Sequence, residues 1–232
     1  MITIKNLKKT FGEKVAVDIP EFHIEKGQIL GLVGNNGAGK TTLFRLILDL
    51  LNADHGEVQI KDINPATSEE WKHFTGAFID EGFLIDFLTP EEYFDFIGKV
   101  CNMTPEAIQE RLAHFEKFMA GEIVGQKKLI RDYSAGNKQK IGIISALFNS
   151  PELVVLDEPF NFLDPSGQNI LKNMLEEYNK ETGATILISS HNLQHTVDVS
   201  HRIALLENGV ILHDLSNEKG NTEKVLEDYF NI

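Results

Sequence analysis

The chain has 232 residues, in which 22 Lys and Arg are outnumbered by 35 Asp and Glu, so its formal net charge is −13. This length supports a large α/β domain with a substantial core, while the acid excess argues against a general basic surface for duplex nucleic acid. The single cysteine, Cys101, excludes an intramolecular disulfide, and no apolar run approaches the length of a membrane span, so we expect a soluble cytoplasmic chain that reaches a membrane only through a partner.

Short strands are predicted in the N-terminal part of the chain. Alternating or continuous apolar residues mark four of them, at Ile2–Leu7, Val15–Ile19, Phe22–Ile24 and Glu57–Lys61. Turn-forming residues separate these runs at Pro20, Gly27 and residues 54–56. Short strands joined by turns are typical of a small antiparallel sheet, which we expect to form a subdomain of its own.

A strand, a glycine-rich turn and a helix follow one another between residues 28 and 51. Ile29–Val33 is a continuous apolar run, which is typical of a strand covered on both faces. Thr41–Leu51 carries its apolar residues at helical spacing. This order of elements indicates the first unit of a parallel α/β sheet.

Residues 68–150 are expected to be mostly helical. Glu91–Cys101 follows a helix start at Thr89-Pro90, in which the threonine can cap the helix and proline suits its first turn. Eight of the 15 Phe residues fall within residues 74–118. This segment is therefore predicted to pack around aromatic residues of its own.

The parallel pattern returns after Pro151. Leu153–Leu156 and Thr185–Ile188 are predicted as buried strands. Two helices and a terminal strand pair are expected at Gly167–Asn179, Asn192–Val199, Arg202–Leu206 and Val210–His213. We therefore expect residues 1–232 to form one α/β domain, with a helical subdomain at about residues 80–150 inserted into its core.

One motif gives the strongest chemical signal. Gly34-Asn-Asn-Gly-Ala-Gly-Lys40-Thr41 matches the phosphate-binding pattern G-x-x-x-x-G-K-[ST], and it lies between a predicted strand and a predicted helix. The glycines let successive N–H groups point inward, and the helix N-terminus adds positive potential. Lys40 is expected to reach the β- and γ-phosphates of a nucleotide, and the Thr41 hydroxyl to ligate Mg²⁺.

Two acidic residues, Asp157 and Glu158, follow the predicted strand Leu153–Leu156. The carboxyl ends of parallel strands face the ligand crevice of an open α/β sheet. Asp157 is therefore placed to hold Mg²⁺, and Glu158 to polarise an attacking water as a general base.

A second anion-receptive helix start is predicted at Tyr133–Asn137, where Ser134 can cap the helix and Gly136 leaves room for close backbone approach. This helix start is one of a set of ordered motifs, with the phosphate loop, the Leu-Asp-Glu-Pro strand end, Leu163-Asp164-Pro165 and Ser190-His191. In this order, the chain resembles the ATPase subunit of ATP-binding-cassette (ABC) transporters over essentially its whole length. The resemblance implies an α/β fold with a P-loop NTPase (RecA-like) core, an N-terminal antiparallel β subdomain and an inserted α-helical subdomain.

The resemblance also implies roles for single residues. Phe11 is similar in position to the aromatic residue that stacks on adenine, and His191 to the switch histidine that contacts the γ-phosphate. The signature motif, at Tyr133–Asn137, contacts the γ-phosphate of the opposite subunit in this family, and Asp164 is similar to the D-loop aspartate. The implied catalytic residues are Glu158, His191 and Lys40. The implied ATP-binding residues are Phe11, Gly34, Asn35, Asn36, Gly37, Ala38, Gly39, Lys40, Thr41, Thr42, Ser134, Gly136 and Asp164.

The sequence departs from the family pattern at a few positions. The Gln-loop position holds Asp80, whose carboxylate can still approach Mg²⁺. Ala135 and Asn137 replace the usual Gly and Gln of the signature motif, so modest turnover is expected. His191 and His195 have a spacing that is also compatible with zinc, but no third ligand follows at metal-binding spacing.

The function implied by the resemblance is Mg²⁺-dependent ATP hydrolysis that powers transport. Two ATPase subunits, expected as a homodimer, would close head to tail around ATP and move an integral membrane permease at the inner face of the membrane. The motifs are most similar to those of bacterial exporters of the antibiotic-resistance type, and no nucleic-acid partner is expected. The alternative is a soluble non-transport ABC ATPase of translation, repair or iron–sulfur assembly, whereas Glu158 argues against a non-hydrolysing regulatory module.

Overall fold

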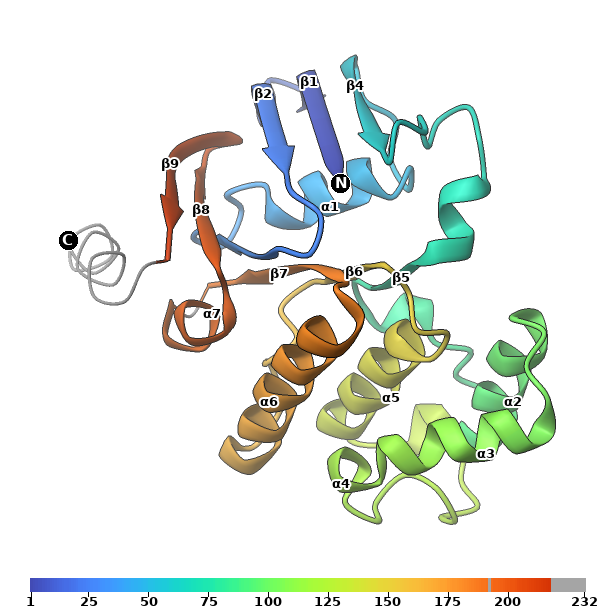
Figure 1. Ribbon diagram of the computed structural model, residues 1–232. Helices are drawn as coiled ribbons and strands as arrows, with labels where there is room; N and C mark the ends of the chain where they lie inside the picture. Colours follow the sequence, from blue (N-terminus) through green and yellow to red (C-terminus); the bar gives the residue numbers. More distant parts are fainter. Residues whose placement is uncertain (192, 218–232) are drawn as a thin grey trace.

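The computed structural model describes residues 1–191 and 193–217 of the chain. Figure 1 shows a small sheet on one side of a central sheet, and helices on the other side. The small sheet has the strand order β2-β1-β4, and both of its strand pairs are antiparallel. Its strands are β1 (Ile2–Phe11), β2 (Lys14–Ile24) and β4 (His55–Ile60). The predicted N-terminal antiparallel sheet is thus confirmed.

The prediction of a turn at Pro20 was wrong, because β2 runs without interruption through this residue. Proline lacks the backbone N–H of a sheet ladder, so it is tolerated in strands mainly at a sheet edge. β2 is such an edge strand, since it pairs only with β1. The apolar runs on either side of Pro20 therefore belong to one strand.

The central sheet has the strand order β5-β6-β7-β3-β8-β9, parallel from β5 to β8 and antiparallel between β8 and β9. Its strands are β3 (Ile29–Val33), β5 (Thr75–Phe78), β6 (Leu153–Leu156), β7 (Thr185–Ser190), β8 (Arg202–Glu207) and β9 (Val210–Ser216). The mostly helical prediction for residues 68–150 missed β5, which forms the outer edge of this sheet beside β6.

Side chains of the central strands alternate between two hydrophobic clusters. Leu153 and Val155 of β6 pack with α1 (Lys40–Ile47) and with the small sheet. Val154 and Leu156 pack on the other side, with α5 (Ala135–Leu147) and α6 (Pro165–Thr182). Both faces of the parallel strands are therefore covered, which explains their continuous apolar sequences.

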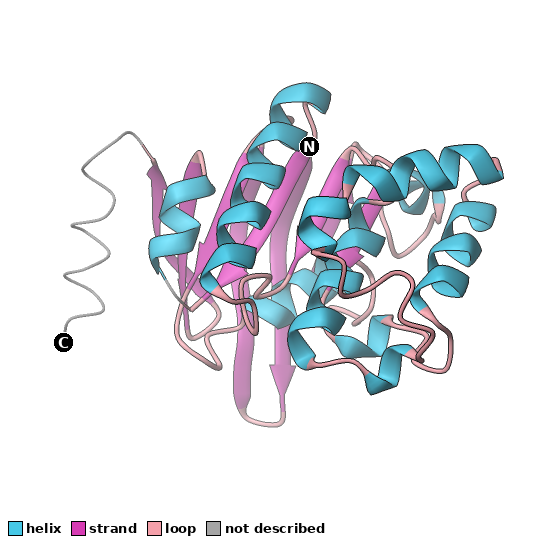
Figure 2. Cartoon of the chain, turned by 90° about the horizontal axis from the view of Figure 1, so that it is seen from below, coloured by secondary structure: helices cyan, strands magenta, loops and turns pink. Residues whose placement is uncertain are grey.

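The helices that the sequence analysis names are present, with changes at their ends. Figure 2 shows most of the helices in front of the central sheet when the molecule is viewed from below, whereas α1 packs on the opposite face, with the small sheet. The remaining helices are α2 (Pro90–Val100), α3 (Pro105–His114), α4 (Glu116–Met119) and α7 (Leu193–Val199), with 3₁₀ turns at Glu70–Phe74, Glu81–Phe83 and Ile130–Asp132. α1 ends earlier than predicted, at Ile47, and Asn192, the predicted first residue of α7, lies outside the described residues. Across the described ranges, no helix is both long and apolar enough to cross a membrane.

The helical insert is joined to the core by aromatic packing. Thr89 begins α2 with a capping box, in which its side chain accepts from the Glu92 N–H while the Glu92 carboxylate accepts from the Thr89 N–H. One turn later, Phe94 stacks on Phe148, which follows α5, with 5.5 Å between ring centroids. Both rings are fully buried. This contact fixes the insert against the helix that contains the predicted signature motif.

We predict that Phe94→Ala lowers the free energy of unfolding by about 3–5 kcal/mol, because it removes a buried ring and leaves a cavity against Phe148. Phe96 lies on the same helix with an exposed side chain, so Phe96→Ala is the control and should change stability by about 0.5 kcal/mol or less. Urea unfolding of both variants measures the difference. An equal loss of unfolding free energy in the two variants would show that the stacked pair does not hold the insert.

Candidate active site

The phosphate loop connects β3 to α1, and its glycines are required by close backbone contacts. A Cβ on Gly34 would lie 2.2 Å from the carbonyl oxygen of Leu206, and a Cβ on Gly39 would lie 2.2 Å from the carbonyl oxygen of Ala16. Gly39 also has a φ of 113°, which side chains rarely allow. The loop can therefore curl around an anion only with glycine at these positions.

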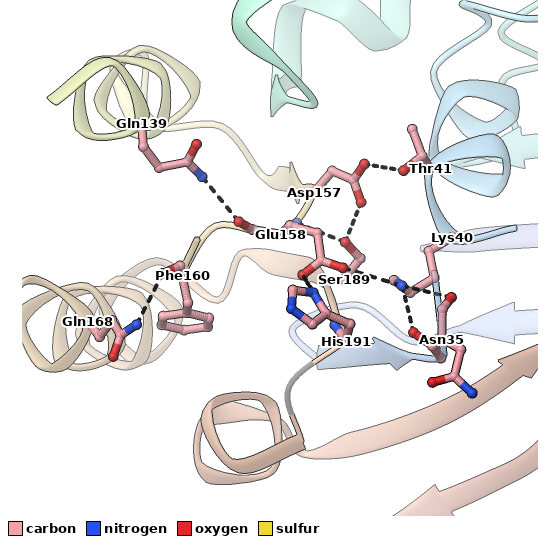
Figure 3. Close-up of polar contacts among 11 residues, drawn as sticks. Asn35, Lys40, Thr41, Gln139, Asp157, Glu158, Phe160, Gln168, Ser189 and His191 are labelled. Atoms are coloured by element: carbon pink, nitrogen blue, oxygen red, sulfur yellow. Dashed lines mark hydrogen bonds and ion pairs between the residues drawn. The ribbon is translucent and has the colours of Figure 1, made fainter. Parts of the chain in front are cut away.

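Lys40 begins α1, and its ammonium lies inside the loop. Its residue is only 6% exposed. Its Nζ donates to the carbonyl oxygen of Gly34 at 2.7 Å and lies 3.3 Å from Oε1 of Glu158 (Figure 3). The predicted catalytic lysine and glutamate, 118 positions apart in the sequence, thus form an ion pair at the carboxyl edge of the central sheet.

Asp157 follows β6 and is the most strongly desolvated acid of the site. The Thr41 hydroxyl donates to its Oδ2 at 2.5 Å, and the Ser189 hydroxyl donates to its Oδ1. Burial raises the pKa of Asp157, although the hydrogen bonds from Ser189 and Thr41 oppose this shift. A carboxylate next to a hydroxyl is the oxygen donor set that suits Mg²⁺, which takes its other ligands from substrate phosphates and water.

Glu158 is held on three sides. Its carboxylate Oε2 lies 2.8 Å from Nδ1 of His191 and accepts from the His191 backbone N–H at 3.2 Å. Its own N–H donates to the Ser189 hydroxyl at 2.8 Å, and Gln139 Nε2 donates to its carbonyl oxygen at 3.2 Å. The structure therefore brings His191 to the side of Glu158, as its position after β7 predicts. Within the described residues, no group of three His, Cys, Asp or Glu is arranged to bind a metal.

The predicted ATP-binding residues, apart from Gly34 and Asn35, line two separate pockets. Phe11, whose ring is 52% exposed, lines a pocket of about 220 Å³ with the phosphate loop, including Asn36, Ala38 and Thr42. Ser134, Gly136 and Asp164 line a different pocket of about 380 Å³. The two pockets share no lining residue, so one chain alone does not join its signature motif to its own phosphate loop.

The second pocket is built from two helix starts. Ser134 caps α5 by accepting from the Asn137 N–H at 3.3 Å, and Asp164 caps α6 by accepting from the Gly167 N–H at 3.0 Å. A Cβ on Gly136 would lie 2.6 Å from the carbonyl oxygen of Phe162. The predicted cap is confirmed, and the missing side chain of Gly136 makes room for the Phe162 carbonyl oxygen of the same chain.

Asp80 does not share a contact with Thr41 or Asp157, although the sequence placed all three at Mg²⁺. Its Oδ1 accepts from the Gly82 N–H at 2.8 Å, and its Oδ2 accepts from Arg45 at 2.8 Å. Both carboxylate oxygens are thus engaged by α1 and by the turn that Asp80 itself caps. An arginine on the exposed face of α1 competes for this carboxylate, and nothing in the motif spacing indicates that pair.

Sequence reasoning missed two residues that hold the site. Ser189 lies near the end of β7 and links Asp157 with the backbone of Glu158, and Gln139 holds the Glu158 carbonyl from α5. A serine directly after the apolar run Thr185–Ile188 is a signal that the sequence does offer, because a polar residue at the end of a buried strand needs a hydrogen-bond partner. Gln139 gives no such signal, because it lies in a polar helix start whose partner is known only from the fold.

We predict that Asp157→Asn becomes more stable relative to the parent protein as the pH rises from about 4 to about 8. Because the folded-state pKa of Asp157 is raised, the group favours folding most at low pH and loses that contribution as the pH rises through the folded-state value. Asparagine carries no charge at any of these pH values. Urea unfolding without Mg²⁺ and nucleotide gives the difference in the free energy of unfolding at each pH. The prediction is contradicted if the parent protein becomes more stable relative to Asp157→Asn as the pH rises.

Comparisons with known proteins agree with this geometry. The model of the ABC transporter family matches residues 17–161. The chain is 35% identical to the uncharacterized ABC transporter ATP-binding protein YhaQ of Bacillus subtilis, over 90% of this chain and 69% of the relative. It is 32% identical to the bacitracin transport ATP-binding protein BcrA of Enterococcus faecalis (93% and 69% covered) and 32% identical to the lantibiotic transport ATP-binding protein SrtF of Streptococcus pyogenes (100% and 96% covered).

Solved structures show the same fold. A dimeric bacterial ABC transporter cassette superposes with a TM-score of 0.84 at 23% identity, covering 95% of this chain and all of that one. A dimeric cassette in a post-hydrolysis state, bound to ADP and Pi, gives a TM-score of 0.83 at 22% identity with the same coverage. The match to the family model covers more than half of the chain, and the alignments with the three relatives cover 90% of it or more. The chain belongs to the ABC transporter family, as an ATP-binding ATPase subunit.

Proposed function

We propose that two copies of this chain bind Mg·ATP head to tail and hydrolyse it to power export through a separate membrane subunit. The observation that carries the proposal is the contact of Lys40 with Glu158 and of Glu158 with His191, beside the Thr41–Asp157 pair at the phosphate loop. These residues supply a phosphate-binding cation, a base and an oxygen donor set at one sheet edge.

The geometry supports a sequence of events at this edge. When the β- and γ-phosphates of ATP enter the loop, they compete with Gly34 and Glu158 for the Lys40 ammonium. Glu158 is then released from its cation and can orient a water for in-line attack, while His191 holds the other side of its carboxylate. Thr41 and Asp157 would hold Mg²⁺, which neutralises charge on the phosphates when bound.

The two separate pockets support a site made by two chains. Ser134 and Gly136 lie in one pocket and Lys40 in the other, and no residue lines both. A head-to-tail pair places the α5 N-terminus of one chain over the phosphate loop of the other, where its N–H groups can bind the γ-phosphate. Both of the similar solved cassettes are described as dimeric, which agrees with this arrangement.

A groove beside α2 supports docking of a membrane subunit. The α2 groove, as we call it, has a volume of about 250 Å³. It is lined by Tyr93 and Ile97 of α2, by Cys101 just after this helix, by the edge strand β5 and by Lys72 and His73. Phe96 and Val100 lie exposed on α2, and Phe87 lies exposed just before it. Exposed apolar side chains that cluster beside a groove are typical of protein interaction sites, so a cytoplasmic segment of a permease is the proposed occupant.

Export is proposed because two relatives are named for bacitracin and lantibiotic transport. A peripheral position on the inner face of the membrane follows from docking to such a subunit. The soluble alternative, an ABC ATPase of translation, repair or assembly, would present this α2 groove to RNA or to a scaffold protein instead. Co-purification with a polytopic membrane protein decides between the two.

We predict that Glu158→Gln lowers kcat for ATP hydrolysis about 10²–10⁴-fold, because an amide cannot accept the proton of the attacking water. ATP binding should be retained, since the amide keeps the shape of the side chain. The matched control is Glu177→Gln on the exposed part of α6, which removes the same charge and should keep the parent rate. Comparable activity in Glu158→Gln and the parent protein would refute the assigned role.

A second prediction concerns the α2 groove. Phe87→Glu combined with Phe96→Glu should remove co-purification with the membrane subunit, because two charges would have to be buried against its apolar segment. The ATPase rate of the isolated subunit should change less than about 2-fold, as both side chains lie away from the phosphate loop. Val210→Glu, an exposed position at the opposite edge of the central sheet, is the control. Retained co-purification in the double variant would exclude this docking face.

A further inference from the structure

The backbone of Glu158 has an unusual conformation for a residue with a side chain. Its φ is 48°, in the left-handed region that favours glycine. Such a conformation persists only where the surrounding structure determines it, and it is frequent where a side chain must be aimed at a substrate. The question is which groups hold Glu158 in this state.

Two side chains from different elements contact the backbone polar groups of Glu158, whose carbonyl oxygen also accepts from the Asn161 backbone N–H at 3.1 Å. Ser189 of β7 accepts the N–H of Glu158 at 2.8 Å, and Gln139 of α5 donates to its carbonyl oxygen at 3.2 Å. Figure 3 shows the Gln139 amide pointing from its helix toward this carbonyl. Gln139 is only 8% exposed, so its amide has little access to water as an alternative partner.

The helix that carries Gln139 is fixed on both sides of this contact. Lys138 forms an ion pair with Glu81 at 3.1 Å, and Lys140 forms one with Glu122 at 3.5 Å. Three successive residues of α5 therefore contact three different segments of the chain. The helix itself is held by the packing of its buried residues, among them Ile141 and Ile144, in the core. The Gln139 amide therefore approaches Glu158 from a rigid element, which is what a positioning contact requires.

We propose that Gln139 is a positioning residue for hydrolysis, which holds the left-handed backbone of Glu158 and so aims its carboxylate at the attacking water. The inference rests on the proposed role of Glu158. A misplacement of about 1 Å at a reacting group can cost about 10²-fold in rate. Loss of the Gln139 contact should therefore slow the chemical step while the phosphate loop still binds ATP.

The test compares Gln139→Leu with Gln168→Leu. Gln168 is the matched control, because its Nε2 also donates to a backbone carbonyl of the same turn, that of Phe160, at 3.2 Å. Steady-state hydrolysis should show kcat lowered about 10-fold or more in Gln139→Leu, with KM for ATP within about 2-fold of the parent. Gln168→Leu should keep both values within about 2-fold. If Gln139→Leu does not fold, the isosteric Gln139→Glu, which lacks the amide donor, takes its place.

A double variant separates positioning from a general structural effect. If Gln139 acts through Glu158, adding Gln139→Leu to Glu158→Gln should not lower the residual rate further. A kcat within about 2-fold of the parent in Gln139→Leu would overturn the inference. Equal losses in the Gln168 control, or a further loss in the double variant, would also overturn it.

The outcome is separable from that of the proposed function. A parent-like rate in Glu158→Gln would refute the assigned base and, with it, this inference. A large loss in Glu158→Gln together with a parent-like rate in Gln139→Leu would refute only the positioning role.

Discussion

The ion pair between Lys40 and Glu158 depends on the order of strands in the central sheet. β7 lies between β3 and β6, and all three are parallel, so the segments that follow β3 and β6 meet above the end of β7. Val33 of β3 pairs with Ser190, the last residue of β7. This register places the phosphate loop, the two acids and His191 at one edge. A parallel sheet with this order therefore assembles the site from three segments that are distant in the sequence.

The acidic balance of the chain and an anionic substrate are compatible because the positive potential at the site is local. The loop supplies inward-facing N–H groups and a helix N-terminus. Lys40 is the buried cation of the loop, and Glu158 lies within 3.3 Å of it. A cation that is already paired with the base makes the base dependent on substrate, since phosphates that take Lys40 also change what Glu158 contacts.

Local sequence signals predicted the parts of the fold that follow local rules. The buried strands β3, β6 and β7 are continuous apolar runs, and the starts of α2 and α5 contain their predicted capping residues. β5 escaped prediction because Thr-Gly-Ala-Phe has neither alternation nor an apolar run, and its strand character comes from pairing with β6. A turn was wrongly predicted at Pro20 because only the order of strands in the sheet shows that β2 is an edge strand, in which proline is tolerated.

The residues of the candidate site also fall into those that local sequence signals predicted and those whose contacts only the fold shows. The spacing of the phosphate loop and the acids after β6 indicated Lys40, Thr41, Asp157 and Glu158 without the fold. The partner of Asp80 could not be read from the motifs, because Arg45 lies 35 residues away and binds it across an exposed surface. Ion pairs of this kind contribute little free energy and carry no strong sequence pattern.

α5 connects the two halves of the site in a way that motif reading does not show. Its N-terminus carries Ser134, in the pocket proposed to face the nucleotide of the other chain, and its second turn carries Gln139 at the backbone of Glu158. A rigid helix transmits a displacement at one end to the other. Closure of the pair over ATP, if it shifts Ser134, must therefore also act on the residue that holds Glu158. Binding of the γ-phosphate in one site and alignment of the base in the other then depend on the same helix.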